Sequence, residues 1–134
     1  MHFQGKAIRL QLLADGIAEL CFDRTGDSVN KFDQLTLGEL REVLLLLGSA
    51  QGVRGVLICS AKPESFIVGA DIMEFGALFR LGEDALLQNL EQANAIFNLL
   101  EDLALPSVCA INGSALGGGF ELCLAADARV MATS

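Results

Sequence analysis

Three consecutive glycines, Gly117 to Gly119, most constrain what this chain can fold into. The apolar run from Ser107 to Ile111 before them predicts a short buried strand, and Asn112-Gly113 is a turn signal. A helix-favouring apolar run that carries Glu121 follows directly. The pattern therefore predicts backbone N–H groups exposed at the positive end of a helix dipole, where glycines let a ligand oxygen approach closely.

Glu121 has two interpretations at this turn. A glutamate in the first helical turn commonly does no more than complement the helix dipole and the free N–H groups. The alternative is an acid/base group that lies one turn from an oxyanion hole and exchanges a proton with the bound molecule. A phosphate cradle is disfavoured, because the G-x-G-x-x-G spacing is absent and no Lys-Ser/Thr pair follows the glycines.

The rest of the chain predicts a mixed α/β fold. Apolar runs predict strands, leucines at helical spacing predict helices, and Asp15-Gly16 predicts a hairpin turn. Gly48 is expected as a C-cap, and Asp71 with Glu74 as a capping box. The expected strands are 8–13, 17–22, 54–59, 107–111 and 128–131, and the expected helices are 33–47, one from 71, one from 82 to before Pro106, and 118–126.

Composition limits the classes of partner. A chain of 134 residues is one domain's worth, and 52% of its residues are hydrophobic. No apolar run approaches the about 18 residues of a membrane span. The net charge of −8 argues against nucleic acid. The excess of apolar residues predicts a subunit interface, or further sequence that would cover it.

The cysteines and the single histidine offer no reactive or metal-binding pattern. Cys21, Cys59, Cys109 and Cys123 lie in apolar runs without metal-ligand spacing, so buried reduced thiols are expected. His2 is expected at a frayed terminus. No signal peptide is evident, because polar residues interrupt the first apolar run. These features predict a cytoplasmic chain without a metal site.

Two motifs carry a family resemblance. Asn112-Gly-Ser-Ala-Leu-Gly-Gly-Gly-Phe-Glu121, with Phe66-Ile-Val-Gly-Ala-Asp-Ile72 upstream, resembles the signature of the crotonase (enoyl-CoA hydratase/isomerase) superfamily, and within it the multifunctional β-oxidation proteins. The likeness runs from about Gly16 to the end of the chain. It implies a crotonase-type spiral of ββα units. It also implies that residues 1–134 are the N-terminal portion of such a domain, truncated before its C-terminal part.

The resemblance implies a reaction and a site. The reaction is hydration of a trans-2-enoyl-CoA to a 3-hydroxyacyl-CoA, with Δ3–Δ2 enoyl isomerisation, in fatty-acid β-oxidation. The N–H groups of Val68 and Gly118 would stabilise the enolate oxygen, and Glu121 would move the proton. No cofactor is implied, because acyl-CoA is the substrate. The implied substrate-binding residues are Ser28, Val29, Val68, Gly69, Ala70, Asp71, Gly117 and Gly118.

The resemblance leaves alternatives open. The family's second glutamate would lie beyond Ser134, so the chain could instead be an inactive CoA-binding or structural fragment. Thioester hydrolysis and decarboxylation also occur in the superfamily, although the place of Glu121 favours hydration or isomerisation. A homo-oligomer, or a β-oxidation complex with a thiolase subunit, is the expected assembly. Lys62 is expected to be solvated rather than bound to a CoA phosphate.

Overall fold

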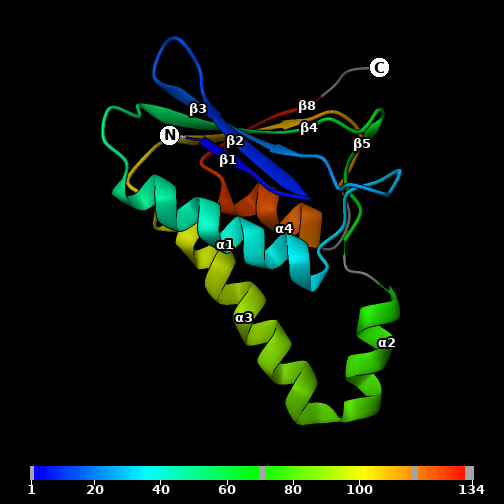
Figure 1. Ribbon diagram of the computed structural model, residues 1–134. Helices are drawn as coiled ribbons and strands as arrows, with labels where there is room; N and C mark the ends of the chain where they lie inside the picture. Colours follow the sequence, from blue (N-terminus) through cyan, green and yellow to red (C-terminus); the bar gives the residue numbers. More distant parts are fainter. Residues whose placement is uncertain (1, 70–71, 116–117, 132–134) are drawn as a thin grey trace.

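The computed structural model describes residues 2–69, 72–115 and 118–131. Within these ranges six strands form one mixed sheet in the order β1-β2-β3-β4-β6-β8, and two strands form a small parallel sheet, β5-β7 (Figure 1). The strands are β1 (His2–Gln4), β2 (Ile8–Leu12), β3 (Ile17–Phe22), β4 (Gly55–Ser60), β5 (Ser65–Ile67), β6 (Ser107–Ile111), β7 (Ser114–Ala115) and β8 (Ala128–Met131). The helices are α1 (Gln34–Ser49), α2 (Ile72–Leu81), α3 (Glu83–Glu101) and α4 (Gly118–Ala125).

The large sheet combines a hairpin with parallel strands. β2 and β3 pair antiparallel around the predicted turn, where Gly16 takes a φ of 79° that L side chains rarely adopt. β3, β4, β6 and β8 then pair in parallel, because a helical crossover separates each from the next. The hairpin and the mixed α/β class predicted from the sequence are both confirmed.

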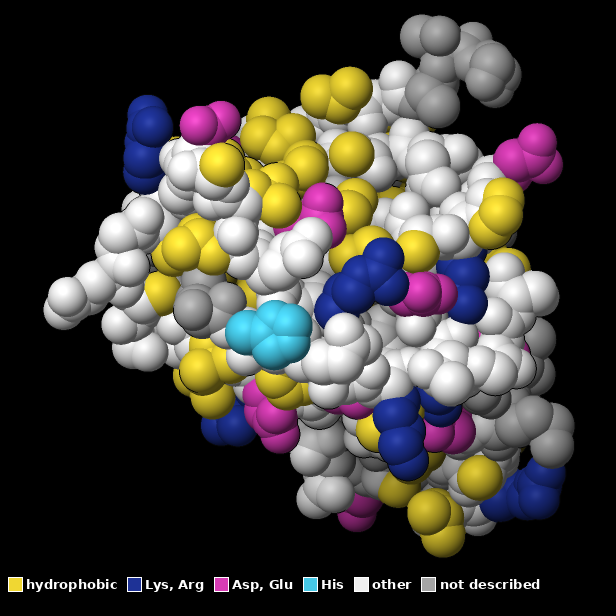
Figure 2. Space-filling model, turned by 45° about the horizontal axis from the view of Figure 1, so that its top comes forward, with side chains coloured by type: hydrophobic (Ala, Val, Ile, Leu, Met, Phe, Trp, Pro, Cys, Tyr) yellow, Lys and Arg dark blue, Asp and Glu magenta, His cyan; other side chains and the backbone are white. Residues whose placement is uncertain are grey.

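The helices α1, α3 and α4 lie on one face of the large sheet (Figure 1). The hydrophobic core lies between these helices and the sheet. Alternate residues of the central strands, such as Leu20 and Ile58, are fully buried there. The other face of the large sheet carries no described helix. Figure 2, in which the top of the molecule is turned toward the viewer, shows hydrophobic side chains gathered on part of the surface. At the sheet's edge Val130 and Met131 of β8 are 62% and 68% exposed.

Several local predictions fail at the ends of elements. Asp33, expected as the first residue of the helix, is its N-cap, and Gly48 lies inside the helix, which ends at Ser49 with Ala50 as C-cap. An exposed glycine costs a helix only about 1 kcal/mol, less than the burial of nearby Leu47 contributes. His2 is paired with Gln11 in β1, so the expectation of a frayed terminus there is wrong.

The helix from 82 is buried only in its second half. Phe97 and Leu100 are buried, whereas Leu90, which lies earlier on the helix, is 54% exposed. The reason is that α2 and the first half of α3 form an arm that extends away from the sheet (Figure 1). Of the described helices, none is both long and apolar enough to cross a membrane.

Candidate functional site

The candidate site forms where the chain leaves two neighbouring parallel strands. β4 and β6 are adjacent, so the segments that follow them emerge at the same edge of the sheet. These two segments then pair with each other as the small sheet, with Ser65 beside Ser114 and Ile67 beside Ala115. Both sequence motifs, far apart along the chain, are therefore brought together.

Two glycines permit this close approach. A Cβ on Gly113 would overlap the Glu64 carbonyl and lie 2.6 Å from the Ser65 nitrogen. A Cβ on Gly119 would overlap the Ile67 carbonyl oxygen and lie 2.9 Å from the carbonyl carbon. Such distances are far inside van der Waals contact. The glycines of the second motif thus place the first turn of α4 directly against the first motif.

The Val68 N–H, predicted as an oxyanion donor, has a backbone acceptor in this structure. The Val68 N–H donates to the Asn30 carbonyl at 2.9 Å, and the Phe32 N–H donates to the Gly69 carbonyl at 2.7 Å. These two bonds tie residues 68–69 to residues 30–32, so the Val68 N–H already has an acceptor. Gly69, the next residue, takes a φ of 104°, which L side chains rarely adopt.

The other expected donor lies at a helix terminus. Gly118 is the first residue of α4, so its N–H belongs to the N-terminal groups that no intrahelical carbonyl satisfies. The helix dipole adds positive potential at that point. Ala70, Asp71 and Gly117, three of the predicted substrate-binding residues, lie outside the described residues.

Glu121 lies in the first turn of α4, as predicted, but not in the apolar surround expected for a tuned base. Its side chain is exposed and lines a groove of about 450 Å³ between α3 and α4, together with Asn94, Asn98 and Glu101. Leu122 points into the core with 0% exposure, and Leu124 is 57% exposed. The described residues therefore leave the carboxylate open to water on one side.

The loop that carries Ser28 and Val29 is fixed in place by Lys62. Ser28 is exposed and Val29 half-buried. The Lys62 side chain is 13% exposed, and its Nζ donates to the carbonyls of Arg24 and Asp27 at 2.8 and 2.7 Å. Nζ also pairs with Asp23 at 3.1 Å, and its hydrogen bond lowers the pKa of that carboxyl despite partial burial. The prediction of a solvated lysine is wrong.

Asp33 holds the far end of the same loop. Its Oδ1 accepts hydrogen bonds from the Thr36 N–H and hydroxyl at 2.8 and 2.6 Å, and its Oδ2 pairs with Arg24 at 2.8 Å. Burial by itself raises the pKa of Asp33, but the hydrogen bonds from Thr36 and Arg24 outweigh it. The net result is a pKa below the ordinary value.

Asn30 is the residue that sequence reasoning missed. It is 1% exposed and bonds to four different segments around the loop and the small sheet. The sequence did offer a signal, because Asn30 directly follows Ser28 and Val29 in the predicted binding loop. A polar residue that is buried in such a loop needs hydrogen-bond partners. The sequence pattern identified the loop but assigned nothing to Asn30 itself.

The cysteines are paired in space but free. Cys21 and Cys59 are neighbours across β3 and β4, and the hydrogen bond between them, with burial, raises the pKa of Cys59. Cys123 has the same effect on Cys109. Asp127 accepts from the Ser107 N–H at 2.8 Å, which is a structural role. Among the described residues no three His, Cys, Asp or Glu side chains come together as a metal-binding group.

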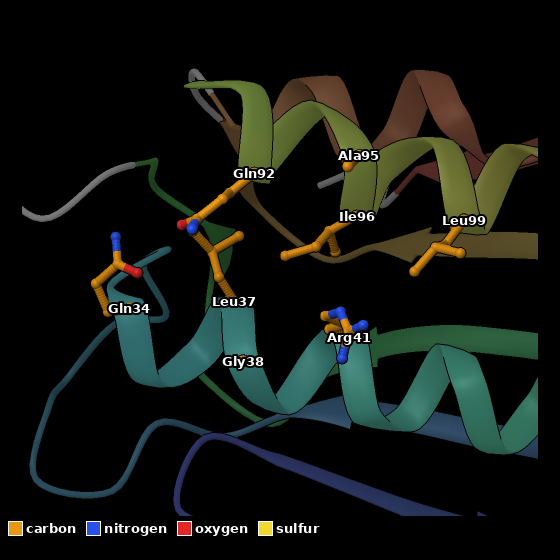
Figure 3. A pocket seen from close by; sticks show the side chains of 8 residues that line it. All are labelled: Gln34, Leu37, Gly38, Arg41, Gln92, Ala95, Ile96 and Leu99. Atoms are coloured by element: carbon orange, nitrogen blue, oxygen red, sulfur yellow. The ribbon is translucent and has the colours of Figure 1, made fainter. Parts of the chain in front are cut away.

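A second groove, of about 470 Å³, lies between α1 and α3 (Figure 3). Leu37, Ile96 and Leu99 face one another across it, and Arg41 lies beside them. None of the predicted site residues lines it. It is therefore separate from the site formed by the two motifs.

These features agree with comparisons to known proteins. The family model of enoyl-CoA hydratase/isomerase matches residues 13–134, so the chain belongs to that family. The alpha subunit of the fatty acid oxidation complex from Pseudomonas putida is 54% identical over all 134 residues, and that from Pseudomonas syringae is 53% identical. The chain spans 19% and 18% of the length of these two relatives.

Solved structures confirm the crotonase-type fold. The enoyl-CoA hydratase of Bacillus anthracis matches 96% of this chain with a TM-score of 0.86 and 28% identity. A putative enoyl-CoA hydratase/isomerase of Mycobacterium abscessus matches 93% of it with a TM-score of 0.83 and 32% identity. This chain covers 48% of each of those chains.

Proposed function

We propose that this chain contributes the oxyanion hole and one acid/base glutamate of a domain that hydrates trans-2-enoyl-CoA and shifts Δ3 double bonds to Δ2. One observation carries the proposal: glycines force the N-terminus of α4 against the end of β5, with Glu121 in the first turn of that helix. Membership of the enoyl-CoA hydratase/isomerase family supports the same reaction class.

The oxyanion hole would act on the thioester carbonyl. Addition of water to the β-carbon of an enoyl thioester places negative charge on the carbonyl oxygen. The donors would be the Gly118 N–H and one N–H from residues 69–70, since the Val68 N–H is occupied by Asn30. A donor already aimed at the developing charge lowers the barrier by about 3 kcal/mol.

Glu121 would supply the proton transfers. In hydration it would take a proton from the attacking water, and in isomerisation it would carry a proton between two carbons of the acyl chain. The exposed carboxylate in the α3–α4 groove is accessible to water, which hydration consumes. We expect no cofactor or metal in this reaction, because the backbone donors and carboxylate chemistry are sufficient.

The CoA portion would lie along the loop of Ser28 and Val29. The Lys62 amine is occupied by Asp23 and two carbonyls, so we do not assign it to a phosphate of CoA. The relatives are named subunits of a fatty acid oxidation complex. We therefore propose acyl-CoA as the substrate, a thiolase subunit or further copies of the chain as partners, and the cytoplasm as the location.

The test is turnover of a short trans-2-enoyl-CoA, followed by loss of its conjugated thioester absorbance. Glu121→Gln should lower the rate about 10²- to 10⁴-fold, because the amide cannot accept the proton. Glu91→Gln, a change of another exposed glutamate on α3, should leave the rate at the parent value. An unchanged rate in Glu121→Gln would contradict the proposed role.

A second candidate is tested by the same experiment. The chain spans only a small part of its relatives, so it could bind a CoA thioester without turning it over. Equilibrium binding of a saturated acyl-CoA to the folded parent, without hydration of the enoyl-CoA, would favour this binding function over catalysis.

A further inference from the structure

We propose that Asn30 is a positioning residue, which holds the oxyanion-donor segment after β5 against the loop that carries Ser28 and Val29. The proposal rests on the proposed function for the identity of the ligand. The contacts of Asn30 themselves do not depend on that function.

The side chain of Asn30 joins segments from four parts of the chain. Its Oδ1 accepts from the Arg24 N–H at 2.9 Å, inside the loop. Its Nδ2 lies 3.0 Å from the Phe66 carbonyl of β5, 2.8 Å from Ser60 Oγ of β4 and 3.2 Å from the Phe22 carbonyl of β3. One amide group thus links the ends of three strands to the loop.

The backbone of Asn30 acts on the donor segment directly. Its carbonyl accepts the Val68 N–H, and two residues later the Phe32 N–H donates to the Gly69 carbonyl. The side chain of Asn30, its carbonyl and the Phe32 N–H together hold residues 66 to 69 at three points, Phe66, Val68 and Gly69. The Gly69 carbonyl shares one planar peptide group with the N–H that follows it, so the bond from Phe32 to that carbonyl constrains the direction of the N–H as well.

An amide is the side chain that fits these partners. Asn30 must accept from one N–H and donate to carbonyl and hydroxyl oxygens in the same buried place. Aspartate has the same shape but, when ionised, would turn acceptors toward the carbonyls of Phe22 and Phe66. Alanine would remove the donor to the Phe66 carbonyl and the acceptor of the Arg24 N–H, which costs free energy where these groups are buried.

Substitution of an asparagine that only stabilises the fold would affect ligand binding differently from substitution of one that positions the donor segment. Loss of a structural residue reduces the folded fraction, but each remaining folded molecule would bind and polarise its ligand as the parent does. Loss of a positioning residue changes the folded molecule itself. The structural role and the positioning role are therefore distinguished by a property that is measured per molecule of bound ligand.

The experiment uses the full chain and cinnamoyl-CoA, an aryl-conjugated enoyl thioester. Hydrogen bonds to its carbonyl oxygen shift its absorbance to longer wavelength. In Asn30→Asp and Asn30→Ala the shift per bound ligand should be lost, while the dissociation constant changes less than about threefold. For a turned-over enoyl-CoA, kcat should fall on the order of 100-fold with KM little changed, as for a misplaced catalytic group.

Asn89→Asp, a change of a half-buried asparagine on the α3 arm, is the control and should retain the parent shift. A parent-like shift in folded Asn30→Asp would overturn the proposal. If neither Asn30 variant folds, Ser60→Ala removes one of the Nδ2 partners, and it should reduce the shift in the same direction; a full shift there would overturn the proposal.

Hydrogen exchange separates this proposal from the proposed function. If the parent itself produces no shift, the oxyanion-hole assignment fails. The positioning role is then decided by amide exchange at Val68 and Phe32, whose N–H groups donate in the two bonds between residues 30–32 and residues 68–69. Faster exchange at these two amides in Asn30→Asp, with the core strand β6 still protected, supports it, and parent-like exchange overturns it.

Discussion

Gly119 offers the most direct test of how the site is built. In Gly119→Ala the added Cβ would lie 2.9 Å from both the carbonyl carbon and the Cβ of Ile67 and would overlap the carbonyl oxygen. Ordinary carbon contacts begin at about 3.5 Å, so the two carbon contacts alone require α4 and β5 to separate by roughly 0.6 Å, and the overlap with the carbonyl oxygen requires more. The obstacle is strand backbone, which no side-chain rotation can remove.

Gly119→Ala should lower the unfolding free energy moderately and the hydration rate more strongly. Overpacking of a buried contact costs about 1–3 kcal/mol, which a domain with about 5–15 kcal/mol of stability survives. The same shift moves the Gly118 N–H relative to residues 69–70. A displacement of this size should lower kcat on the order of 10- to 100-fold. Urea unfolding and enoyl-CoA hydration measure the two effects.

Gly48→Ala is the matched control. A Cβ there meets nothing within 4 Å, and the residue lies inside helix α1. This variant should gain about 1 kcal/mol of stability and keep the parent rate. If Gly119→Ala unfolds at the parent's urea midpoint, the packing argument is refuted. If it is destabilised but retains the parent rate, the contact is real and the oxyanion-hole geometry is refuted.

Three further predictions concern the loop and the thiols. Lys62→Met should lower the unfolding free energy by about 1–3 kcal/mol, measured in urea, because Asp23 and two carbonyls lose their donor. Asp33, whose pKa is lowered in the fold, should stabilise the chain above about pH 4 and lose that contribution as pH falls through its lower folded value. Cys59 and Cys109, with raised pKa values, should react with iodoacetamide at neutral pH far more slowly in the folded chain than in urea.

Each of these predictions has a clear contrary result. Lys6→Met, at an exposed lysine, serves as the control for Lys62 and should leave stability near the parent value. If Asp33→Asn shows the same acid dependence of the unfolding free energy as the parent, Asp33 does not contribute as described. Equal alkylation rates in the folded and unfolded chain would show that the thiols are not protected.

The elements that the sequence predicted well have local causes. The β2–β3 hairpin follows from Asp15-Gly16, α1 from leucines at helical spacing, and β6 from an uninterrupted apolar run. The glycine turn and the helix of Glu121 were likewise predictable, because glycine and helix-forming residues change abruptly there. In each case the residues that decide the structure are adjacent in the chain.

The failures concern contacts between distant segments. Nothing local distinguishes Val68 from its neighbours as an N–H that bonds to Asn30, because backbone groups are the same at every position. The burial of Lys62 depends on carbonyls that lie well before it in the chain. The exposure of Leu90 depends on where the α2–α3 arm extends, which periodicity within the helix does not report.

The small β5–β7 sheet also has a consequence for the order of folding. It joins two short strands that come side by side only after β4 and β6, which precede them in the chain, have paired, so this junction forms after the large sheet. A kinetic intermediate with the large sheet and all helices in place would have nearly the full far-ultraviolet circular dichroism signal. It would still lack the proposed oxyanion hole until this last junction closed. Recovery of ligand binding should therefore lag behind recovery of secondary structure during refolding.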